Sequence, residues 1–241
     1  MATIFKLILY QPLLNLLVFF YNTIGFQDLG LSIIFLTIFI RIILYPISLS
    51  QIKAQKSLAE LQPKLNELKK KFGNDKERLS KEMIELYRTH KINPFSSCLP
   101  LIIQLPILIA VYQVFKSGIL TENLLLYPFI YNPGRLNPLA FGFINLAERN
   151  FFLALLTGIV QFFQSKMFPR QKPPPEVRKE KGAKDESTMA ILNKQMVLMM
   201  PIFTVVIGAT LPSGLVLYWL ISLVLAILQQ SIIFKKIPSL S

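Results

Sequence analysis

The sequence predicts an all-α integral membrane protein: a core of five transmembrane helices, a cytoplasmic two-helix hairpin, and an N-terminal helix that lies in the membrane interface. Hydrophobic residues make up 53% of the chain and charged residues only 16%, whereas charged residues are about 25% of an ordinary soluble domain. Five apolar stretches approach the ~20 residues that a helix needs to cross the hydrocarbon of a bilayer. We therefore expect a single membrane domain over residues 1–241.

The N-terminal apolar stretch, residues 3–25, is less regular than the rest. Lys6, Gln11, Pro12 and Asn15 interrupt it, so it could cross the membrane or lie on its outer surface as an amphipathic helix. We favour the second arrangement. The stretch has no small-residue cleavage site, and we therefore expect that it is not a cleaved signal peptide.

Five clear spans follow this stretch. They are residues 29–50, 94–117, 150–168, 188–211 and 214–234. Pro212-Ser213-Gly214 forms a tight turn between the last two, and residues 118–148 predict a partly apolar external loop. Residues 169–187 contain a proline triplet and a run of charges, which predicts a flexible cytoplasmic loop.

Residues 51–93 predict two amphipathic helices that pair through their apolar faces. The apolar residues recur at intervals of three and four, as on one side of a helix. They are Leu58, Leu61, Leu65, Leu68 and Phe72 in the first helix and Leu79, Met83 and Leu86 in the second. Between them Gly73-Asn74 supplies a helix stop and Asp75 an N-cap. We therefore expect a charged hairpin that projects from the membrane.

The distribution of basic residues predicts the orientation of the chain. The formal net charge is +13, and 21 of the 26 Lys and Arg lie in residues 51–93, in or beside residues 169–187, or near the C-terminus. Basic loops are enriched on the cytoplasmic side of membranes. Both charged segments and the C-terminus are therefore expected in the cytoplasm, and the charge is attributed to topology and not to specific binding of nucleic acid.

Arg41 lies near the middle of the span 29–50, where a guanidinium is costly. The free-energy cost of an arginine at the bilayer centre is at least ~2.5–3.5 kcal/mol on insertion scales. None of the five spans contains Asp or Glu, and Asp28 is thirteen residues away, which is about 20 Å along a helix. Water and neutral polar groups remain as the partners that could offset the cost.

The spans supply such polar groups, chiefly in their cytoplasmic halves. Thr37, Arg41, Tyr45 and Ser48 are spaced by four, four and three, which places them on one helix face. Further candidates are Ser97, Gln104, Thr157, Gln161, Gln164, Asn193 and Gln195. The pattern predicts a polar cavity that opens to the cytoplasm, with Arg41 at its deep end. The alternative is that these groups only join helices through hydrogen bonds.

The sequence offers no catalytic or cofactor site. It has one cysteine and one histidine, no cluster with metal-ligand spacing, no phosphate-binding loop and no nucleophile elbow. We therefore expect neither an enzyme nor a cofactor. A cationic cavity suits an acidic guest, such as the polar flank of a membrane polypeptide. A small-anion transporter is a weaker alternative, because such folds are commonly built from internal repeats and none is visible.

Four segments of the sequence resemble the YidC/Oxa/Alb family of membrane protein insertases. The resemblance runs from about Gly30 to Phe234. Its segments are IRIILYPIS, the long block LQPKLNELKKKFGNDKERLSKEMIELYRTHKINPFSSCLPLIIQLPI, SKMFP, and LPSGLVLYWLISLVLAILQQ. The chain lacks the large external domain of the larger bacterial members and a long basic C-terminal tail, so it resembles a short form.

The resemblance implies a five-helix core around a hydrophilic groove that is open to the cytoplasm and to lipid. It implies that Arg41 and Thr37 line the groove and that Gln104 belongs to the second core helix. Tyr218 and Trp219 occupy positions where members often carry a Tyr-Tyr pair that touches the substrate, although Trp219 departs from that pair.

The resemblance also implies partners and a location. Nascent membrane proteins would be the substrates, in the inner (plasma) membrane of a bacterium, and the lipid bilayer would receive their apolar segments. The sequence leaves open whether the chain works alone or with a Sec-type translocon, and whether it contacts a ribosome. It also leaves open a membrane chaperone that assembles proteins without inserting them.

Overall fold

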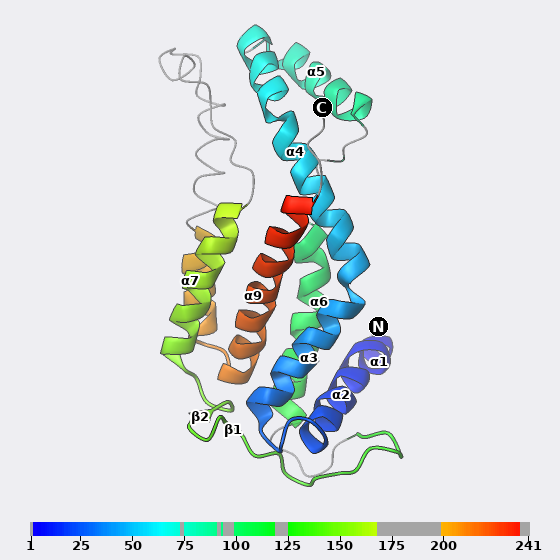
Figure 1. Ribbon diagram of the computed structural model, residues 1–241, viewed down its shortest axis with the longest axis vertical. Helices are drawn as coiled ribbons and strands as arrows, with labels where there is room; N and C mark the ends of the chain where they lie inside the picture. The colour runs from blue at the N-terminus through cyan, green and yellow to red at the C-terminus, as the bar shows by residue number, and fades with distance from the viewer. Residues whose placement is uncertain are drawn as a thin grey trace.

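The computed structural model describes residues 2–72, 75–90, 93, 99–118, 125–167 and 199–236, and its described part is mostly helical. Several helices run roughly along the long axis, and a helical hairpin extends beyond them at one end (Figure 1). The helices are α1 (Ala2–Phe5), the π-helical turn η1 (Lys6–Tyr10), α2 (Gln11–Asn22), α3 (Leu29–Ile43), α4 (Tyr45–Phe72), α5 (Lys76–Thr89), α6 (Leu99–Gln113), the π-helical turn η3 (Val114–Gly118), α7 (Phe151–Met167), an unlabelled helix Met199–Gly208, and α9 (Ser213–Lys236).

The N-terminal helices α1, η1 and α2 follow one another without a break and have two unlike faces. Leu14, Leu17 and Val18 of α2 are fully buried in the core, and α2 packs on α3. On the other side, Ile4 and Leu7 are exposed. The chain here therefore has one face on the bundle and an apolar face that is free, and its position in the membrane interface stays a prediction.

The predicted span 29–50 is wrong as a single helix. Helix α3 ends at Ile43, α4 begins at Tyr45, and the two axes meet at 67°. The cause is Pro46, which has no N–H to donate to the carbonyl of Ile42 and whose ring crowds that carbonyl. Thr37 and Arg41 consequently lie on α3, whereas the other two members of the predicted polar face, Tyr45 and Ser48, lie on α4.

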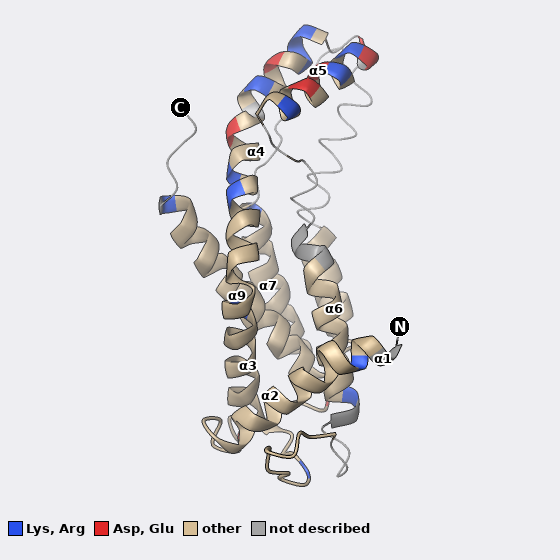
Figure 2. Ribbon diagram, turned by 90° about the vertical axis from the view of Figure 1, so that its right-hand side faces the viewer, with Lys and Arg blue, Asp and Glu red and all other residues tan. Residues whose placement is uncertain are grey.

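Helix α4 continues from this bend into the hairpin and pairs there with α5. Leu61 and Leu65 of α4 and Leu79 of α5 are buried, and the two helices contact each other. The carboxylate of Asp75 accepts a hydrogen bond from the Arg78 N–H at 3.0 Å, which confirms the predicted N-cap. Charged side chains gather on this hairpin, whereas the helical body is nearly free of them (Figure 2).

The segment 125–150 covers the opposite end of the bundle (Figure 1). It includes a ribbon that the all-α prediction did not contain: β1 (Leu139–Ala140) pairs antiparallel with β2 (Ile144–Asn145). Two residues per strand leave no periodic pattern that a sequence could reveal. Leu136, Ala140 and Leu146 of this segment are buried in the core, so the segment packs into the end of the bundle.

Hydrogen bonds fasten this segment to three helices. The Asn15 amide of α2 donates to the Leu125 carbonyl at 3.2 Å, and its oxygen accepts from the Tyr127 N–H at 2.6 Å. Asp28, which caps α3, also accepts from the N–H of Phe141. The Ser213 hydroxyl at the start of α9 donates to the Asn145 carbonyl at 2.7 Å. Hydrogen bonds between helix side chains and backbone groups of segment 125–150 therefore hold this segment on the end of the bundle.

Only some of the described helices are long enough to cross a membrane. Among the described residues, Ser213–Lys235 is by itself long and apolar enough to cross a membrane, and α3 with α4 meets the criterion as a bent pair. The helices Ile103–Lys116, Phe151–Met167 and Met199–Gly208 are apolar but shorter. Parts of the predicted spans 94–117 and 188–211, and all of the predicted loop 169–187, lie outside the described residues.

Helix α7 and the helix Met199–Gly208 approach each other closely at Gly158. A Cβ atom at this position would overlap Cγ2 of Val205 and would lie 3.1 Å from the Pro201 carbonyl oxygen. We expect Gly158→Ala to lower the free energy of unfolding by about 1–3 kcal/mol, the usual cost of overpacking, as measured by unfolding in mixed micelles of SDS and a mild detergent. Adding Val205→Ala removes the overlapping methyl group and should recover part of the loss. Equal stability of the parent protein and the single variant would contradict this close contact.

Candidate functional site

Arg41 lies in the last turn of α3 and points to α9. Its Nη2 donates a hydrogen bond of 2.6 Å to the backbone carbonyl of Ser222, and α3 packs on α9. The α3–α4 break adds a second favourable term, because the carbonyl end of a helix attracts a cation by about 0.3–1 kcal/mol at exposed sites. The neutral backbone carbonyl of Ser222 on α9 thus binds the guanidinium.

The carbonyl that holds Arg41 belongs to a small polar network between three helices. The Gln104 amide of α6 donates to the Tyr218 hydroxyl of α9 at 3.2 Å. That hydroxyl also hydrogen-bonds the side chain of Ser222. Tyr218 is 1% exposed and Ser222 is 3% exposed. The sequence pattern predicts Arg41 and Gln104 in one cavity, and the family resemblance adds Tyr218. These three residues converge through Ser222, which the sequence pattern does not single out.

The other α3 and α4 candidates lie in different settings. Thr37 is fully buried and its hydroxyl donates to the Ile33 carbonyl of its own helix at 2.6 Å. Ser48 is also buried, whereas Tyr45 is about half exposed. Because the chain bends between Arg41 and Tyr45, the regular spacing of these residues does not place them on one face.

The hydrogen bond that the structure shows for the α7 candidates lies within α7 and does not connect them to the Arg41 network. The Gln161 amide donates to the Ser165 hydroxyl at 3.4 Å, a contact within α7. Gln164 and Trp219 are both half-buried. Ser97, Asn193 and Gln195 lie outside the described residues.

A second polar layer joins α4 to α9 on the hairpin side of Arg41. Gln55 and Gln230 are each 4% exposed, and the Gln230 amide donates to the Gln55 side-chain oxygen at 3.2 Å. The Lys56 ammonium donates to the Phe234 carbonyl at 3.4 Å. Sequence reasoning missed this layer because it assigned residues 51–93 to a solvated hairpin, where glutamines need no explanation. The sequence does contain one signal: Gln51 and Gln55 are one helical turn apart and therefore lie on one side of the helix. The structure shows that both are buried.

The chemistry of this site is cationic and neutral-polar. The helices α3, α6, α7 and α9 and the helix Met199–Gly208 contain no Asp or Glu. In the described part of the chain, no three His, Cys, Asp or Glu side chains lie close enough to hold a metal ion. The guanidinium of Arg41 can donate hydrogen bonds to a neutral acceptor or to an anion.

The comparison with protein families decides the identity. The family described as 60Kd inner membrane protein matches residues 19–239. The chain belongs to this family, the YidC/Oxa1 membrane protein insertases. This confirms the resemblance seen in the sequence. The family is all-α, multi-pass, located in the inner membrane and non-enzymatic.

Curated relatives agree with this assignment. A membrane protein insertase YidC of Fusobacterium nucleatum subsp. nucleatum is 38% identical over 232 residues, which are 95% of this chain and 98% of the relative. The YidC proteins of Geobacter sulfurreducens and Buchnera aphidicola subsp. Baizongia pistaciae are 32% and 34% identical over 95% and 94% of this chain. The chain spans only 38% and 37% of those two relatives, so it corresponds to a part of the longer proteins and to nearly the whole of the shorter one.

The Gln104–Tyr218 hydrogen bond can be tested by a double-mutant cycle. Tyr218→Phe removes the acceptor of the Gln104 amide and should lower the free energy of unfolding in SDS–detergent micelles by about 0.6–2 kcal/mol. In this insertase, Gln104→Met combined with Tyr218→Phe should be less destabilised than the two single changes added together, because the double variant no longer has a Gln104 amide without its acceptor. The lost contact between Tyr218 and Ser222 is common to both Tyr218 variants and cancels in the cycle. Strictly additive losses would mean that the two side chains do not interact.

Proposed function

We propose that this chain is a membrane protein insertase that receives the polar flank of a nascent membrane protein beside Arg41 and releases the adjacent apolar segment into the bilayer. The observation that carries the proposal is the environment of the Arg41 guanidinium. Its guanidinium is bound to the neutral carbonyl of Ser222, and the helices α3, α6, α7, α9 and Met199–Gly208 contain no carboxylate. Within the described part of the chain, the positive charge is therefore bound by a backbone dipole and not by a carboxylate.

An acidic guest can exploit this charge. A carboxylate is a stronger acceptor for a guanidinium than a carbonyl and can take it in a bidentate geometry. At an effective dielectric constant near 20, two opposite unit charges 4 Å apart attract by about 4 kcal/mol. Part of this gain is lost in taking the carboxylate out of water and in replacing the Ser222 contact. The surplus favours acidic flanks over neutral ones.

The transfer of the apolar segment supplies the driving force. Removing apolar surface from water stabilises the inserted state by about 25 cal/mol per Å². Trp219 follows Tyr218 on α9, next to the Arg41 network, and is half-buried, so its ring can offer contact to a passing segment. Tyr218 is buried and would have to become uncovered before it could touch the segment. Insertion by this route needs no nucleotide and no cofactor.

The topology that suits this role is the one predicted from the charges. The five spans 29–50, 94–117, 150–168, 188–211 and 214–234 would cross the membrane, with a bend in the first. The hairpin α4–α5, residues 169–187 and the C-terminus would lie in the cytoplasm. A hydrophilic groove with Arg41, Gln104, Gln161 and Gln164 would then open to the cytoplasm, and the covered end would face outward.

Reconstitution tests the function directly. Proteoliposomes that contain only this protein receive a single-span client with an acidic N-terminal tail, and protease protection of the tail is compared with empty liposomes. Protection that depends on the protein is the expected result. No gain over empty liposomes, with the protein correctly oriented, would favour a chaperone or a partner of a Sec-type translocon.

The electrostatic step is tested by removing the positive charge from the protein and the negative charges from the client. Arg41→Ala should lower insertion of the acidic client by about tenfold, equivalent to roughly 1.4 kcal/mol. The same variant should change insertion of a client with Asn and Gln in the tail much less. Arg135→Ala, at an exposed position of the segment 125–150, is the matched control and should insert both clients normally. An equal loss for both clients would leave Arg41 a purely structural role.

A further inference from the structure

The covered end of the bundle carries aromatic side chains that are turned outward. Three separate parts of the chain contribute them: the turn before α3, the segment 125–150, and the start of α7. The residues are Phe26 (84% exposed), Phe129 (82%), Tyr131 (78%), Phe141, Phe143 (77%) and Phe152 (81%), and we call this set the aromatic collar. Soluble monomers seldom expose so much aromatic surface at one end.

The collar stands on an ordered backbone. The Asn22 amide of α2 donates to the Tyr131 carbonyl at 2.7 Å, and the Tyr21 hydroxyl accepts from the Asn137 N–H at 3.1 Å. The N–H of Phe141 is held by Asp28. The rings are therefore presented by segments that hydrogen bonds attach to α2 and α3, and their exposure does not come from a loose chain.

Two collar residues adopt an unusual backbone conformation. Phe26 has φ of 51° and Phe141 has φ of 54°, in the left-handed region that bulky residues rarely adopt. Gly142, with φ of 80°, completes the turn between β1 and β2. This turn places Phe141 and Phe143 on the outside, with their ring centroids 6.4 Å apart.

We propose that the aromatic collar docks in the headgroup region of the membrane leaflet that lies away from the hairpin. Aromatic rings are enriched where hydrocarbon meets water. The 26 residues of segment 125–150 contain only three charges, Arg135, Glu148 and Arg149, so little would have to be desolvated. The segment is then not a solvated loop but a part of the chain that lies in the lipid interface.

The arrangement favours lipid over a partner protein. The rings come from three segments that lie at the same end of the bundle (Figure 1). Phe152 is also continuous with the exposed apolar side of α7, where Leu155, Leu156 and Ile159 follow. Because the collar is continuous with this exposed apolar side of α7, we expect lipid to cover both surfaces. The inference rests on the family's membrane location and does not depend on how clients are inserted.

Tryptophan fluorescence can locate the collar, because Trp219 is the single tryptophan of the chain. Trp219→Phe gives a background without tryptophan, into which Phe143→Trp or Phe129→Trp is introduced. Ile84→Trp is the matched control, at a position of α5 that is 59% exposed. The proteins are placed in nanodiscs of phosphatidylcholine and phosphatidylglycerol, so that aqueous iodide reaches both faces, and circular dichroism checks that each variant is helical.

Both collar reporters should be quenched by lipids brominated near the headgroup end of the acyl chain. Their quenching by iodide should be about threefold weaker than that of the α5 reporter, as expected for rings in the interface. Iodide quenching equal to that of the α5 reporter, without quenching by brominated lipid, would place the segment in water and overturn the proposal. Protection from both quenchers would also overturn it, because the rings would then be covered by protein.

Discussion

The break between α3 and α4 is the constraint on which the rest of the structure depends. Pro46 cannot continue the hydrogen-bond ladder of α3, so that helix ends two residues beyond Arg41 and the chain turns by 67°. The same break gives α4 the direction in which it leaves the bundle as one side of the hairpin. It also brings the first turns of α4 against α9, where Gln55 meets Gln230. The single break between α3 and α4 thus determines both where the helix of Arg41 ends and the direction of the hairpin.

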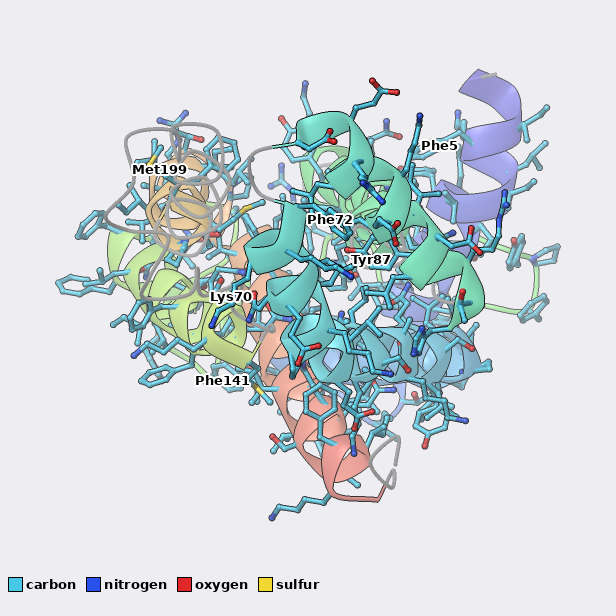
Figure 3. The ribbon with its side chains drawn as sticks, turned by 90° about the horizontal axis from the view of Figure 1, so that it is seen from above. Phe5, Lys70, Phe72, Tyr87, Phe141 and Met199 are labelled. Atoms are coloured by element: carbon cyan, nitrogen blue, oxygen red, sulfur yellow. The ribbon has the colours of Figure 1, made fainter. Side chains whose placement is uncertain are left out.

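The two ends of the bundle differ in the kind of side chain that they carry. At the hairpin end, charged side chains are numerous, and Phe72 and Tyr87 lie over the bundle when it is seen from above (Figure 3). Burial raises the pKa of the Tyr87 phenol, which indicates that the hairpin helices shield part of their own surface. At the other end, apolar loop residues enter the core and hydrogen bonds to α2, α3 and α9 fix the segment in place. Between the two ends, Arg41 is bound by the backbone carbonyl of Ser222.

Much of the helical framework and the placement of Arg41 within an apolar helix can be predicted from the sequence, because apolar length and the cost of a buried guanidinium are local properties. The Asp75 cap is local as well. The bend was missed because the apolar length of residues 29–50 predicts one continuous span, whereas the effect of Pro46 reaches back to the carbonyl of Ile42. The Gln55–Gln230 and Arg41–Ser222 contacts join residues that are 175 and 181 positions apart, and no periodicity within either helix encodes such pairings. The membrane position of the groove residues stays a prediction.

The fastening of segment 125–150 has a consequence for ion permeability. A polar site inside a membrane protein threatens the electrochemical gradient only if water can form a continuous path across the bilayer. Here Leu136, Ala140 and Leu146 fill the bundle end, and that plug is attached to three helices, so a polypeptide that entered from the hairpin side would not have to displace it. In the insertion route proposed above, water would reach Arg41 from the hairpin side, and the packed residues of segment 125–150 would lie between that water and the other face of the membrane.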